Sequence, residues 1–527
     1  MSVSVADRLK TRHHDRPFVL ASVYLVMNNW TDGYVTELPY SVNHFPEMAP
    51  AHLNLALLHL GLAAPSLGAG FNYLELGFGQ GLGLNMLAAT HPQGRFFGND
   101  FMPAHVRAAQ DLAAQAGLDN LSLFEDSFAQ LLERDLPPMD YIVLHGVYTW
   151  VNAENRAIIV ALLHKLLKRG GVVYISYNCL PGWSVKAPLQ RLMSEFAERK
   201  ASGTALERFH AARDFLGALD AADAAFFTRN PAARAMLAEL EKASDAYLLH
   251  EFAPKGWTPF YHTDVAQDLA AADLIYAGSA KLFNNFPAYS LPPKMQALIE
   301  GTADVGLRET LRDFAVQTQF RRDIFVRDAR PLYDEEIDAH FRGLRLALWR
   351  PPASCALKCQ IPVGELQLDD ETFGPLLESL AQGPQEMHSL MQLPAFVAAG
   401  EEHCIDAINV LLCLDYIGIS APVDVDSKAR VHALNRALVE RLRNGERISG
   451  FASAALGAGV TISYHDLLFL AAQNAGCVRA EDIAAFAQAI LSRDLVHVDD
   501  AELAARNREA GNFVTYGVDF YRSLELF

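Results

Sequence analysis

The stretch that most constrains the fold is the glycine-rich segment FNYLELGFGQGLG at residues 71–83. Apolar residues run directly into the pattern acidic-x-Gly-x-Gly-x-Gly, and apolar residues recur at helical spacing after Gly83. This order predicts a strand, a tight turn and a helix. Glycine permits positive φ and lets a ligand approach the backbone, and the following helix presents free N–H groups. The segment therefore predicts a ligand site at the turn.

Two kinds of ligand site use such a turn. The dinucleotide fingerprint G-x-G-x-x-G places its third glycine three residues after the second. Counted from Gly77 and Gly79 that position is Leu82, and counted from Gly79 and Gly81 it is Leu84. The dinucleotide pattern fails in both registers. What remains is the form in which an acidic residue precedes three alternating glycines.

The residues around and after this turn alternate between helices and apolar strands. Further strands are predicted at 94–101, 121–124, 140–144 and 172–176, and helices at 49–62, 104–115 and 153–168. Such alternation predicts a doubly wound α/β sheet, whose ligands bind at the carboxyl ends of its parallel strands. Asp100 ends the second strand, where an acid can accept hydrogen bonds from both hydroxyls of a ribose.

The rest of the chain carries no motif of this kind. Residues 188–246 predict a helical insertion, and 247–252 and 274–280 are predicted to supply the last strands. After prolines at 287, 292 and 293 we expect a helical stretch at 295–320, strands at 344–348, 357–361 and 365–368, and helices at 373–381 and 402–414. The order helix, helix, strand after Asp369 is compatible with a winged-helix-like module. Because it has no basic recognition face, we interpret it as a protein-contact or packing domain.

Composition narrows the function classes. The chain has 527 residues, 51% hydrophobic and 20% charged, which indicates a globular protein of about three domains. A net charge of −18 disfavours a nucleic-acid partner and favours lysine-bearing or amine substrates. Six cysteines without a C-x-x-C pair indicate reduced thiols, a cytoplasmic location and no metal site. No stretch approaches the roughly 20 apolar residues of a bilayer span, so we expect no membrane insertion.

Several blocks together resemble one branch of the class I S-adenosylmethionine (AdoMet) methyltransferases. The blocks are ELPYSVNHFPEMAP, YLELGFGQG, HGVYTWV and GGVVYISYNCLPGW, and YLLHEFAPKGWTPFY resembles the methyltransferase regulatory domain of that branch. The branch includes the rickettsial protein lysine methyltransferases. The resemblance covers about residues 35–290 and implies a Rossmann-like sheet with a helical insertion, followed by α+β C-terminal domains.

From this resemblance we expect four parts in the chain. Residues 1–45 form an N-terminal lid segment, and residues 46–290 form the AdoMet-binding domain, with the insertion at 188–246 and the regulatory-type segment at 247–290. A middle domain follows at 291–400 and a C-terminal domain at 401–527.

The resemblance also implies AdoMet as the cofactor. The glycine turn would pass beside the methionine end of AdoMet, and an acid after the third strand would meet the adenine amino group, with an apolar neighbour against the ring. The expected cofactor-binding residues are Glu75, Gly77, Phe78, Gly79, Gly81, Asp100, Phe101, Asp126, Ser127, Phe128 and His145.

The expected reaction is N-methylation of a protein lysine or another amine. An ammonium group with a pKa of roughly 10.4 must lose a proton before it attacks, so side chains that desolvate and orient the amine are needed. Aromatic walls can also hold an ammonium group. The candidates are Tyr148, Tyr177, Asn178 and His145 at the ends of strands four and five, Tyr34, Glu37 and Tyr40 in the lid, and Trp150 and Trp183 as walls.

Two alternatives stay open. The acceptor could be an oxygen, nitrogen or carbon of a small metabolite, which a closed apolar pocket over the methyl site would favour. An open groove toward the second half would instead favour a protein. The chain could also be a non-catalytic AdoMet-binding scaffold. The sequence leaves a homodimer and the role of the second half open.

Overall fold

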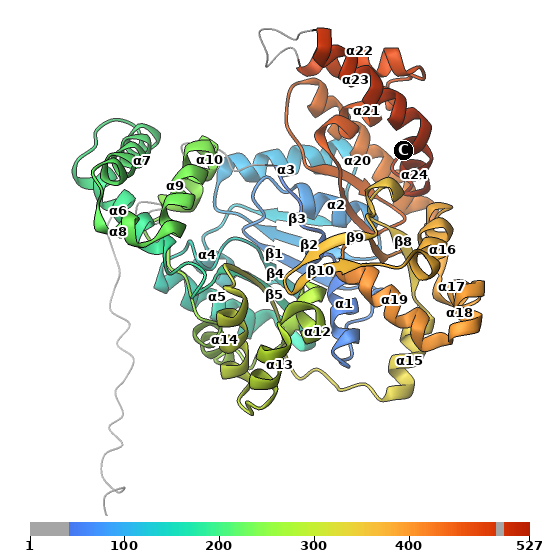
Figure 1. Cartoon of the computed structure of the whole chain (residues 1–527), viewed down its shortest axis with the longest axis horizontal. Helices are drawn as coiled ribbons and strands as arrows, with labels where there is room; N and C mark the ends of the chain where they lie inside the picture. Colours follow the sequence, from blue (N-terminus) through green and yellow to red (C-terminus); the bar gives the residue numbers. More distant parts are fainter. Residues whose placement is uncertain (1–41, 492–499) are drawn as a thin grey trace, which may run out of the picture.

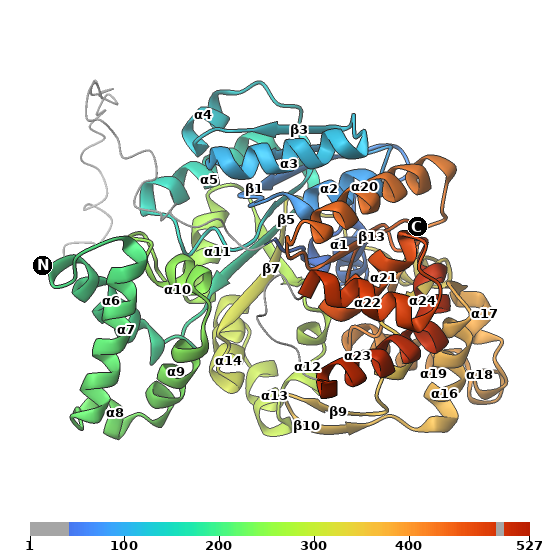
Figure 2. The ribbon, with the colours of Figure 1, turned by 90° about the horizontal axis from the view of Figure 1, so that it is seen from above.

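The computed structural model of the chain describes residues 42–491 and 500–527. A central sheet flanked by helices lies in the middle, the helical insertion extends to one side, and the C-terminal half packs on the other side (Figures 1 and 2). The expected lid residues Tyr34, Glu37 and Tyr40 lie outside the described residues.

The central sheet has seven strands in the order β3-β2-β1-β4-β5-β7-β6. These are β1 (Asn72–Leu76), β2 (Arg95–Asn99), β3 (Leu121–Phe124), β4 (Met139–Leu144), β5 (Leu167–Asn178), β6 (Ile275–Ser279) and β7 (Phe320–Val326). Strands β1 to β5 pair in parallel, and β7 runs antiparallel to both β5 and β6. The strand order reverses between β1 and β4, which is where sheets of this class bind ligands.

The predicted doubly wound α/β sheet is confirmed. Strand β1 is buried along its whole length, because helices cover both faces of the sheet. The helices of this part are α1 (Pro50–His59), α2 (Leu82–Thr90), α3 (Pro103–Ala116), α4 (Phe128–Glu133) and α5 (Ala153–Leu166). The short 3₁₀ helix η2 (Pro46–Met48) precedes α1.

The insertion after β5 is helical, as predicted. It consists of α6 (Lys186–Arg199), α7 (Ala205–Ala221), α8 (Ala225–Arg229), α9 (Pro231–Lys242) and α10 (Asp245–Phe252). The strand predicted at 247–252 is wrong, because these residues form α10. Ser244 caps this helix, and Leu248, Leu249 and Phe252 pack into the insertion's own core. A six-residue apolar run is too short to reveal its period, so the sequence did not separate helix from strand.

The regulatory-type segment completes the sheet. Helix α11 (His262–Ala270) leads into β6, which the sequence predicts, and helices α12 (Pro287–Ser290), α13 (Pro293–Glu300) and α14 (Val305–Val316) lead into β7. The sequence prediction misses β7 and ends a helical stretch there. The sheet therefore extends past residue 290, the boundary expected from the sequence.

The second half contains short strands and many helices. Its strands are β8 (Arg345–Leu348), β9 (Lys358–Ile361), β10 (Gly364–Gln367), β11 (Gln385–Glu386), β12 (Ile417–Ile419), β13 (Gly450–Ser453) and β14 (Ala458–Thr461). Its helices are α15 (Asp334–Arg342), α16 (Asp370–Ala381), α17 (Met387–Met391), α18 (Pro394–Ala399), α19 (Glu401–Cys413), α20 (Val425–Arg443), α21 (Tyr464–Asn474), α22 (Ala480–Leu491), α23 (Asp500–Asn512) and α24 (Val518–Ser523). The predicted strands at 344–368 appear as β8 to β10, and the predicted helices as α16 and α19.

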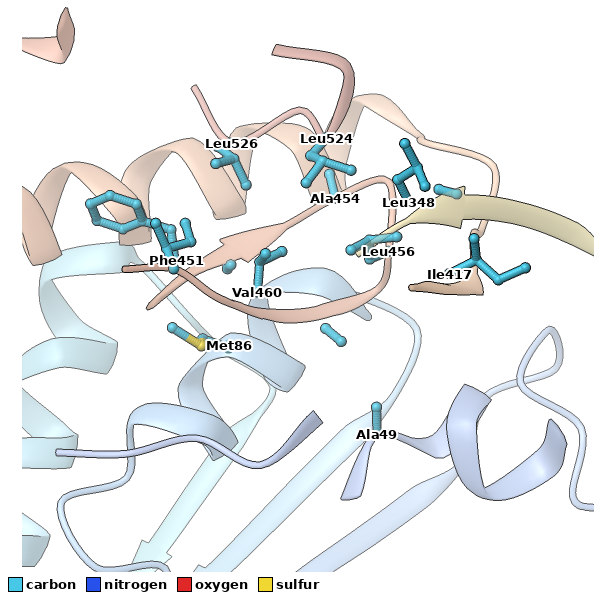
Figure 3. Close-up of a cluster of buried hydrophobic side chains, with 14 of the residues drawn as sticks. Ala49, Met86, Leu348, Ile417, Phe451, Ala454, Leu456, Val460, Leu524 and Leu526 are labelled. Carbon is cyan, nitrogen blue, oxygen red and sulfur yellow. The ribbon is translucent and has the colours of Figure 1, made fainter. Parts of the chain in front are cut away.

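The C-terminal half packs directly on the sheet domain. Helix α20 lies against α2 and α3, and Arg430 on α20 forms a 2.7 Å ion pair with Asp119. The hairpin β13–β14 lies over α2, so that Val460 faces Met86 (Figure 3). On the other side of the hairpin, Leu524 and Leu526 close the cluster. One continuous apolar core thus joins the two halves on the side of the glycine turn.

The described residues contain neither a candidate membrane-spanning helix nor a candidate metal cluster. Across 42–491 and 500–527, no helix combines the length and the apolar character that a membrane crossing requires. The same residues contain no group of three or more His, Cys, Asp or Glu side chains arranged to hold a metal ion.

Candidate active site

A cavity lies at the carboxyl ends of β1, β2 and β4. Its wall combines the segment before α1, the glycine turn, the ends of β2 and β4, and the hairpin β13–β14. The lining residues are Asn43, His44, Phe45, Pro46, Met48, Ala49, Glu75, Gly77, Phe78, Gly79, Gln80, Gly83, Leu87, Asp100, Phe101, Met102, His105, Phe128, His145, Gly146, Val147, Trp150, Val151, Ala458 and Gly459. The structure thus brings together most of the residues that the sequence predicts as cofactor-binding.

The glycine turn needs its glycines for different reasons. Gly77, Gly79 and Gly81 all have positive φ, between 59° and 75°. A Cβ at Gly77 would lie 2.6 Å from Cγ2 of Val147, whereas a Cβ at Gly79 would meet no atom within 4 Å. Gly79 therefore borders open space in which a ligand can approach the backbone. Gly81 does not line the cavity, and a Cβ there would lie 2.5 Å from the Cβ of Ala109 on α3.

Replacing Gly77 with alanine is expected to weaken S-adenosylhomocysteine (AdoHcy) binding at least tenfold. The variant has an unfavourable left-handed backbone, and its Cβ also displaces Val147, which lines the cavity. Gly117→Ala is a matched control, since Gly117 has a φ of 67° but no atom within 4 Å of an added Cβ. Both variants should lose thermal stability, and only Gly77→Ala should lose affinity in calorimetry. Equal affinities would show that the Gly77 contact does not shape the cavity.

Asp100 lies at the end of β2 with its carboxylate fixed by the backbone. Its Oδ2 accepts a hydrogen bond from Gly79 N–H at 2.9 Å, and its Oδ1 accepts one from Met102 N–H at 2.9 Å. Nδ1 of His105 lies 3.3 Å from Oδ1. Each carboxylate oxygen has two lone pairs, so acceptor capacity remains for a ligand hydroxyl.

Glu75 is a buried carboxyl with an unpaired oxygen. Its Oε2 has no hydrogen-bond partner in the described part of the chain, although the side chain lines the cavity. Burial, together with the negative charge of Asp100, raises the pKa of Glu75 to about 8. A buried acceptor without a partner is costly. Glu75 is therefore ready to receive a cationic ligand group.

The residues predicted to bind the adenine do not all lie at the cavity. Phe128 lines the cavity, but Asp126 and Ser127 do not. Both carboxylate oxygens of Asp126 accept hydrogen bonds from Arg134. Ser127 is the N-cap of α4, where its hydroxyl accepts a hydrogen bond from Gln130 N–H. The structure therefore uses these two polar side chains to hold α4 and leaves an aromatic ring toward the cavity.

The predicted acceptor-side tyrosines and asparagine also lie outside the cavity. Tyr148 O–H donates to Asp268 Oδ2 at 2.7 Å, and Tyr177 O–H donates to Asp323 Oδ2 at 2.6 Å. Asn178 donates to Glu251 Oε1 at 2.7 Å. All three side chains are buried and bond the regulatory-type segment or its neighbours. The geometry thus gives them a structural place behind the strand ends, and Tyr40 is outside the described residues.

The two predicted aromatic walls differ in position. Trp150 lines the cavity, whereas Trp183 is buried in the core of the insertion. His145 also lines the cavity, and its ring stacks on Phe45 with centroids 3.6 Å apart. Burial and the charge of Arg322 lower the pKa of His145 to about 3, so its imidazole is neutral at physiological pH.

Sequence reasoning missed the residues that close the cavity from both ends of the chain. His44 bonds Ser449 Oγ through Nδ1 at 2.8 Å, and a Cβ at Gly459 would lie 2.5 Å from the His44 ring. The glycine lets the hairpin β13–β14 approach the segment before α1. The block ELPYSVNHFPEMAP contained a signal for Asn43, His44 and Phe45, but no local pattern marks Gly459.

The cavity suits the methionine and ribose parts of AdoMet. Gly79 leaves open space beside the backbone, Glu75 offers an unpaired carboxyl oxygen for the ammonium group, and Asp100 offers free acceptor capacity for ribose hydroxyls. Phe78, Phe101 and Phe128 provide apolar surface for a ring. These are the groups that such a ligand needs, and they occur at the switch point of the sheet.

Comparison with known proteins gives the same assignment. A family model described as a methyltransferase domain matches residues 74–173, and one described as a predicted methyltransferase regulatory domain matches residues 244–327. An uncharacterized protein of Synechocystis sp. is 35% identical over 465 residues, which cover 88% of this chain and 91% of the relative. The chain belongs to the class I AdoMet-dependent methyltransferases with a regulatory domain.

One rickettsial protein is a more distant relative of this methyltransferase, and the structure of another shares its fold. An uncharacterized protein of Rickettsia prowazekii is 26% identical over 60% of this chain and 57% of the relative. The structure of PKMT2 from Rickettsia typhi in complex with AdoHcy matches with a TM-score of 0.65 at 21% identity, over 92% of this chain and 99% of PKMT2. The second likeness shows that the shared fold extends through the C-terminal half. Together with the methyltransferase-domain match at residues 74–173, the family assignment makes this chain an enzyme whose cofactor is AdoMet.

Proposed function

We propose that this methyltransferase methylates the ε-amine of protein lysine side chains. The observation that carries the proposal is a second cavity of about 560 Å³ beside the cofactor cavity, with which it shares Pro46 and Gly459 as wall residues. It lies between the sheet domain and the second half, as a groove for a protein acceptor would. The name of the rickettsial structural neighbour PKMT2 is consistent with this proposal.

The lining of the second cavity suits an ammonium group. Its charged residues are Glu47, Lys281, Arg322, Arg350, Asp415 and Asp466, and its large aromatic residues are Trp349 and Tyr521. Glu47 is neutralised by a 2.8 Å ion pair with Arg322. Asp466 accepts a 3.1 Å hydrogen bond from Tyr521 O–H and has no basic partner within ion-pair distance in the described part of the chain. Asp466 and Tyr521 can therefore hold a cation against an aromatic wall.

The chemistry follows from the arrangement of the two cavities. AdoMet supplies a methyl group on a positively charged sulfur. The lysine ammonium first loses a proton to solvent, and the amine nitrogen then forms the new N–C bond with its lone pair. The electrons of the broken C–S bond stay on sulfur, which becomes a neutral thioether. Glu75 and Asp100 would hold the cofactor during this displacement, and the walls of the second cavity would align the amine.

The proposal also assigns a role to each half of the chain. The half of the chain after residue 290, expected as a middle domain at 291–400 and a C-terminal domain at 401–527, would recognise the acceptor. The hairpin β13–β14 would join recognition to catalysis, because Gly459 borders both cavities.

Asp466→Asn is expected to lower protein methylation about tenfold without changing AdoHcy affinity. The substitution keeps the shape of the side chain and removes the charge that attracts ammonium. The measurement is transfer of labelled methyl groups to a lysine-rich protein pool, with N-methyl-lysine identified by mass spectrometry. Asp482→Asn on α22 is the matched control, since Asp482 is an exposed acid paired with Arg479.

Two outcomes would count against a protein acceptor. The first is methyl transfer to the low-mass fraction of an extract and not to its proteins, which would favour a small metabolite. The second is an equal loss of protein methylation in Asp466→Asn and Asp482→Asn. That result would mean that the second cavity does not receive the acceptor.

A further inference from the structure

A chain of buried hydrogen bonds ends at His145 on the wall of the cofactor cavity. Gly146 N–H donates to Ser176 Oγ at 2.9 Å, and the Ser176 hydroxyl hydrogen-bonds the hydroxyl of Tyr174. The Tyr174 hydroxyl lies 2.8 Å from Nδ1 of His145. Tyr174 and Ser176 are two residues apart on β5, so their side chains lie on the same face of the strand.

In one direction of these hydrogen bonds, every buried hydroxyl hydrogen has an acceptor. Ser176 Oγ accepts from a backbone N–H, so its own hydroxyl hydrogen is used best on Tyr174. The Tyr174 hydroxyl then donates its hydrogen to Nδ1 of His145, which must be an unprotonated acceptor. A neutral imidazole carries one hydrogen, and here that hydrogen is on Nε2. If Tyr174 donated to Ser176 instead, the hydrogen of the buried Ser176 hydroxyl would have no acceptor among these hydrogen-bonded groups.

The Nε2 hydrogen has no acceptor in the part of the chain that the structure describes. Among residues 42–491 and 500–527, Nε2 of His145 makes no hydrogen bond, and the ring borders the cofactor cavity. Phe45 stacks on one face of the ring and fixes its orientation. His145 therefore presents one oriented neutral donor to the cavity.

The carboxylate of AdoMet also needs hydrogen-bond donors in this cavity. The cavity lining contains no lysine or arginine in the part of the chain that the structure describes. Three N–H groups of the glycine turn are already used: Gly77 donates to Asn99 O, Gly79 to Asp100 and Gly81 to Phe78 O. A carboxylate in this cavity therefore meets no cationic side chain and none of these three N–H groups, so a neutral side-chain donor is well suited to bind it.

The position of His145 fits that role. In AdoMet the carboxylate and the ammonium group are attached to the same carbon, so the carboxylate donor must lie close to the ammonium acceptor. Glu75, the acceptor for the ammonium group, is paired with Val143 in the sheet, and His145 is two residues beyond Val143.

We propose that His145 binds the carboxylate of AdoMet through Nε2–H, and that Tyr174 and Ser176 are positioning residues that fix its tautomer. The inference concerns cofactor binding and does not depend on the identity of the methyl acceptor. Asn43 and Gln80 also line the cavity and can share the carboxylate.

The first test is calorimetry with a ligand pair. AdoMet and its decarboxylated form differ only in the carboxylate. His145→Ala and Tyr174→Phe should each weaken AdoMet binding about tenfold and should leave the binding of decarboxylated AdoMet unchanged. Tyr141→Phe is the matched control, because it removes the hydroxyl of another buried strand tyrosine, which bonds Asn54 at 2.7 Å and not His145. This control should change neither affinity.

The second test is the tautomer itself, measured by ¹⁵N NMR on the wild-type protein labelled at histidine. The His145 signal, assigned by its loss in His145→Gln, should show a protonated Nε2 and an unprotonated Nδ1, and Tyr174→Phe should give a mixture. A protonated Nδ1 in the wild type would overturn the proposal even if a variant fails to fold. An equal loss of affinity for both ligands in Tyr174→Phe would overturn it as well.

Discussion

Asp100→Ala is expected to weaken AdoHcy binding about 100-fold. Both carboxylate oxygens of Asp100 are held by backbone N–H groups, and Oδ2 keeps a free lone pair, so the carboxylate is preorganised to accept a ribose hydroxyl. Hydrogen bonds to a charged group contribute about 1.5–3 kcal/mol each. At the upper end of this range the loss of one such bond is about 3 kcal/mol, which is about a 100-fold change in the dissociation constant. The measurement is isothermal titration with AdoMet and with AdoHcy.

Asp126→Ala supplies the matched control for Asp100. It removes the other acid that the sequence placed at the cofactor, but in the structure Asp126 pairs with Arg134 and lies outside the cavity. Its affinity for AdoHcy should stay within a few-fold of the wild type. If Asp126→Ala loses as much affinity as Asp100→Ala, the adenine end of the site differs from the arrangement described above.

Local chemistry explains which parts of the fold were predictable. The glycine turn, β1 to β5 and Asp100 follow from short patterns, since apolar runs, glycines and strand-terminal acids act on their immediate neighbours. Strand β7 does not, because Arg321 and Asp323 break its apolar alternation. Both are buried, with Arg321 Nε within 3.0 Å of both Asp323 oxygens and Nη1 at 2.8 Å from Asp313. These two charges pair with each other within β7, and their further partners, Asp313 for Arg321 and Tyr177 for Asp323, come from other elements, which a local pattern cannot reveal.

For the site too, the sequence predicted what depends on local patterns and missed what depends on distant contacts. Glu75, Asp100 and His145, which the sequence places at or near strand ends, line the cavity, but the strand ends did not fix side-chain directions. Tyr148 and Tyr177 follow the same strands and point toward Asp268 and Asp323, away from the cavity. The cavity wall formed by Gly459 depends on a contact with His44 across more than 400 residues of chain. Such a contact is set by packing of the two halves and leaves no trace in local sequence.

Glu75 should make cofactor binding depend on pH. Its pKa of about 8 means that the side chain is protonated in the free enzyme at neutral pH. The ammonium group of AdoHcy favours the carboxylate, so binding must release the proton. The apparent affinity should then rise about tenfold per pH unit between pH 6 and pH 8 and level off above pH 8. His44 and His145 stay neutral throughout this range, because burial lowers their pKa values to about 4 and about 3.

Glu75→Gln should remove this dependence. The variant should bind AdoHcy at least tenfold more weakly than the wild type at pH 8 and show a flat profile from pH 6 to pH 8. Titrations in buffers of different ionisation enthalpy should detect release of about one proton per ligand at pH 6.5 in the wild type and none in the variant. His105→Gln is a control for the histidine beside Asp100 and should keep the wild-type slope. A flat wild-type profile would contradict the assignment of Glu75 to the ammonium group.

The same ionisation should appear in the stability of the free enzyme. The pKa of Glu75 is higher in the folded state than the ordinary value near 4.5, so between these values the folded chain holds a proton that the unfolded chain releases. The stabilisation from this proton is complete below the unfolded pKa and is lost as pH rises through about 8. Thermal unfolding from pH 5 to pH 9 should therefore show wild-type stability falling relative to Glu75→Gln, and AdoHcy should reverse the difference at pH 8. A carboxyl that destabilises the free protein and is relieved by ligand behaves as expected of a binding group, since its oxygen has no partner in the described part of the free chain.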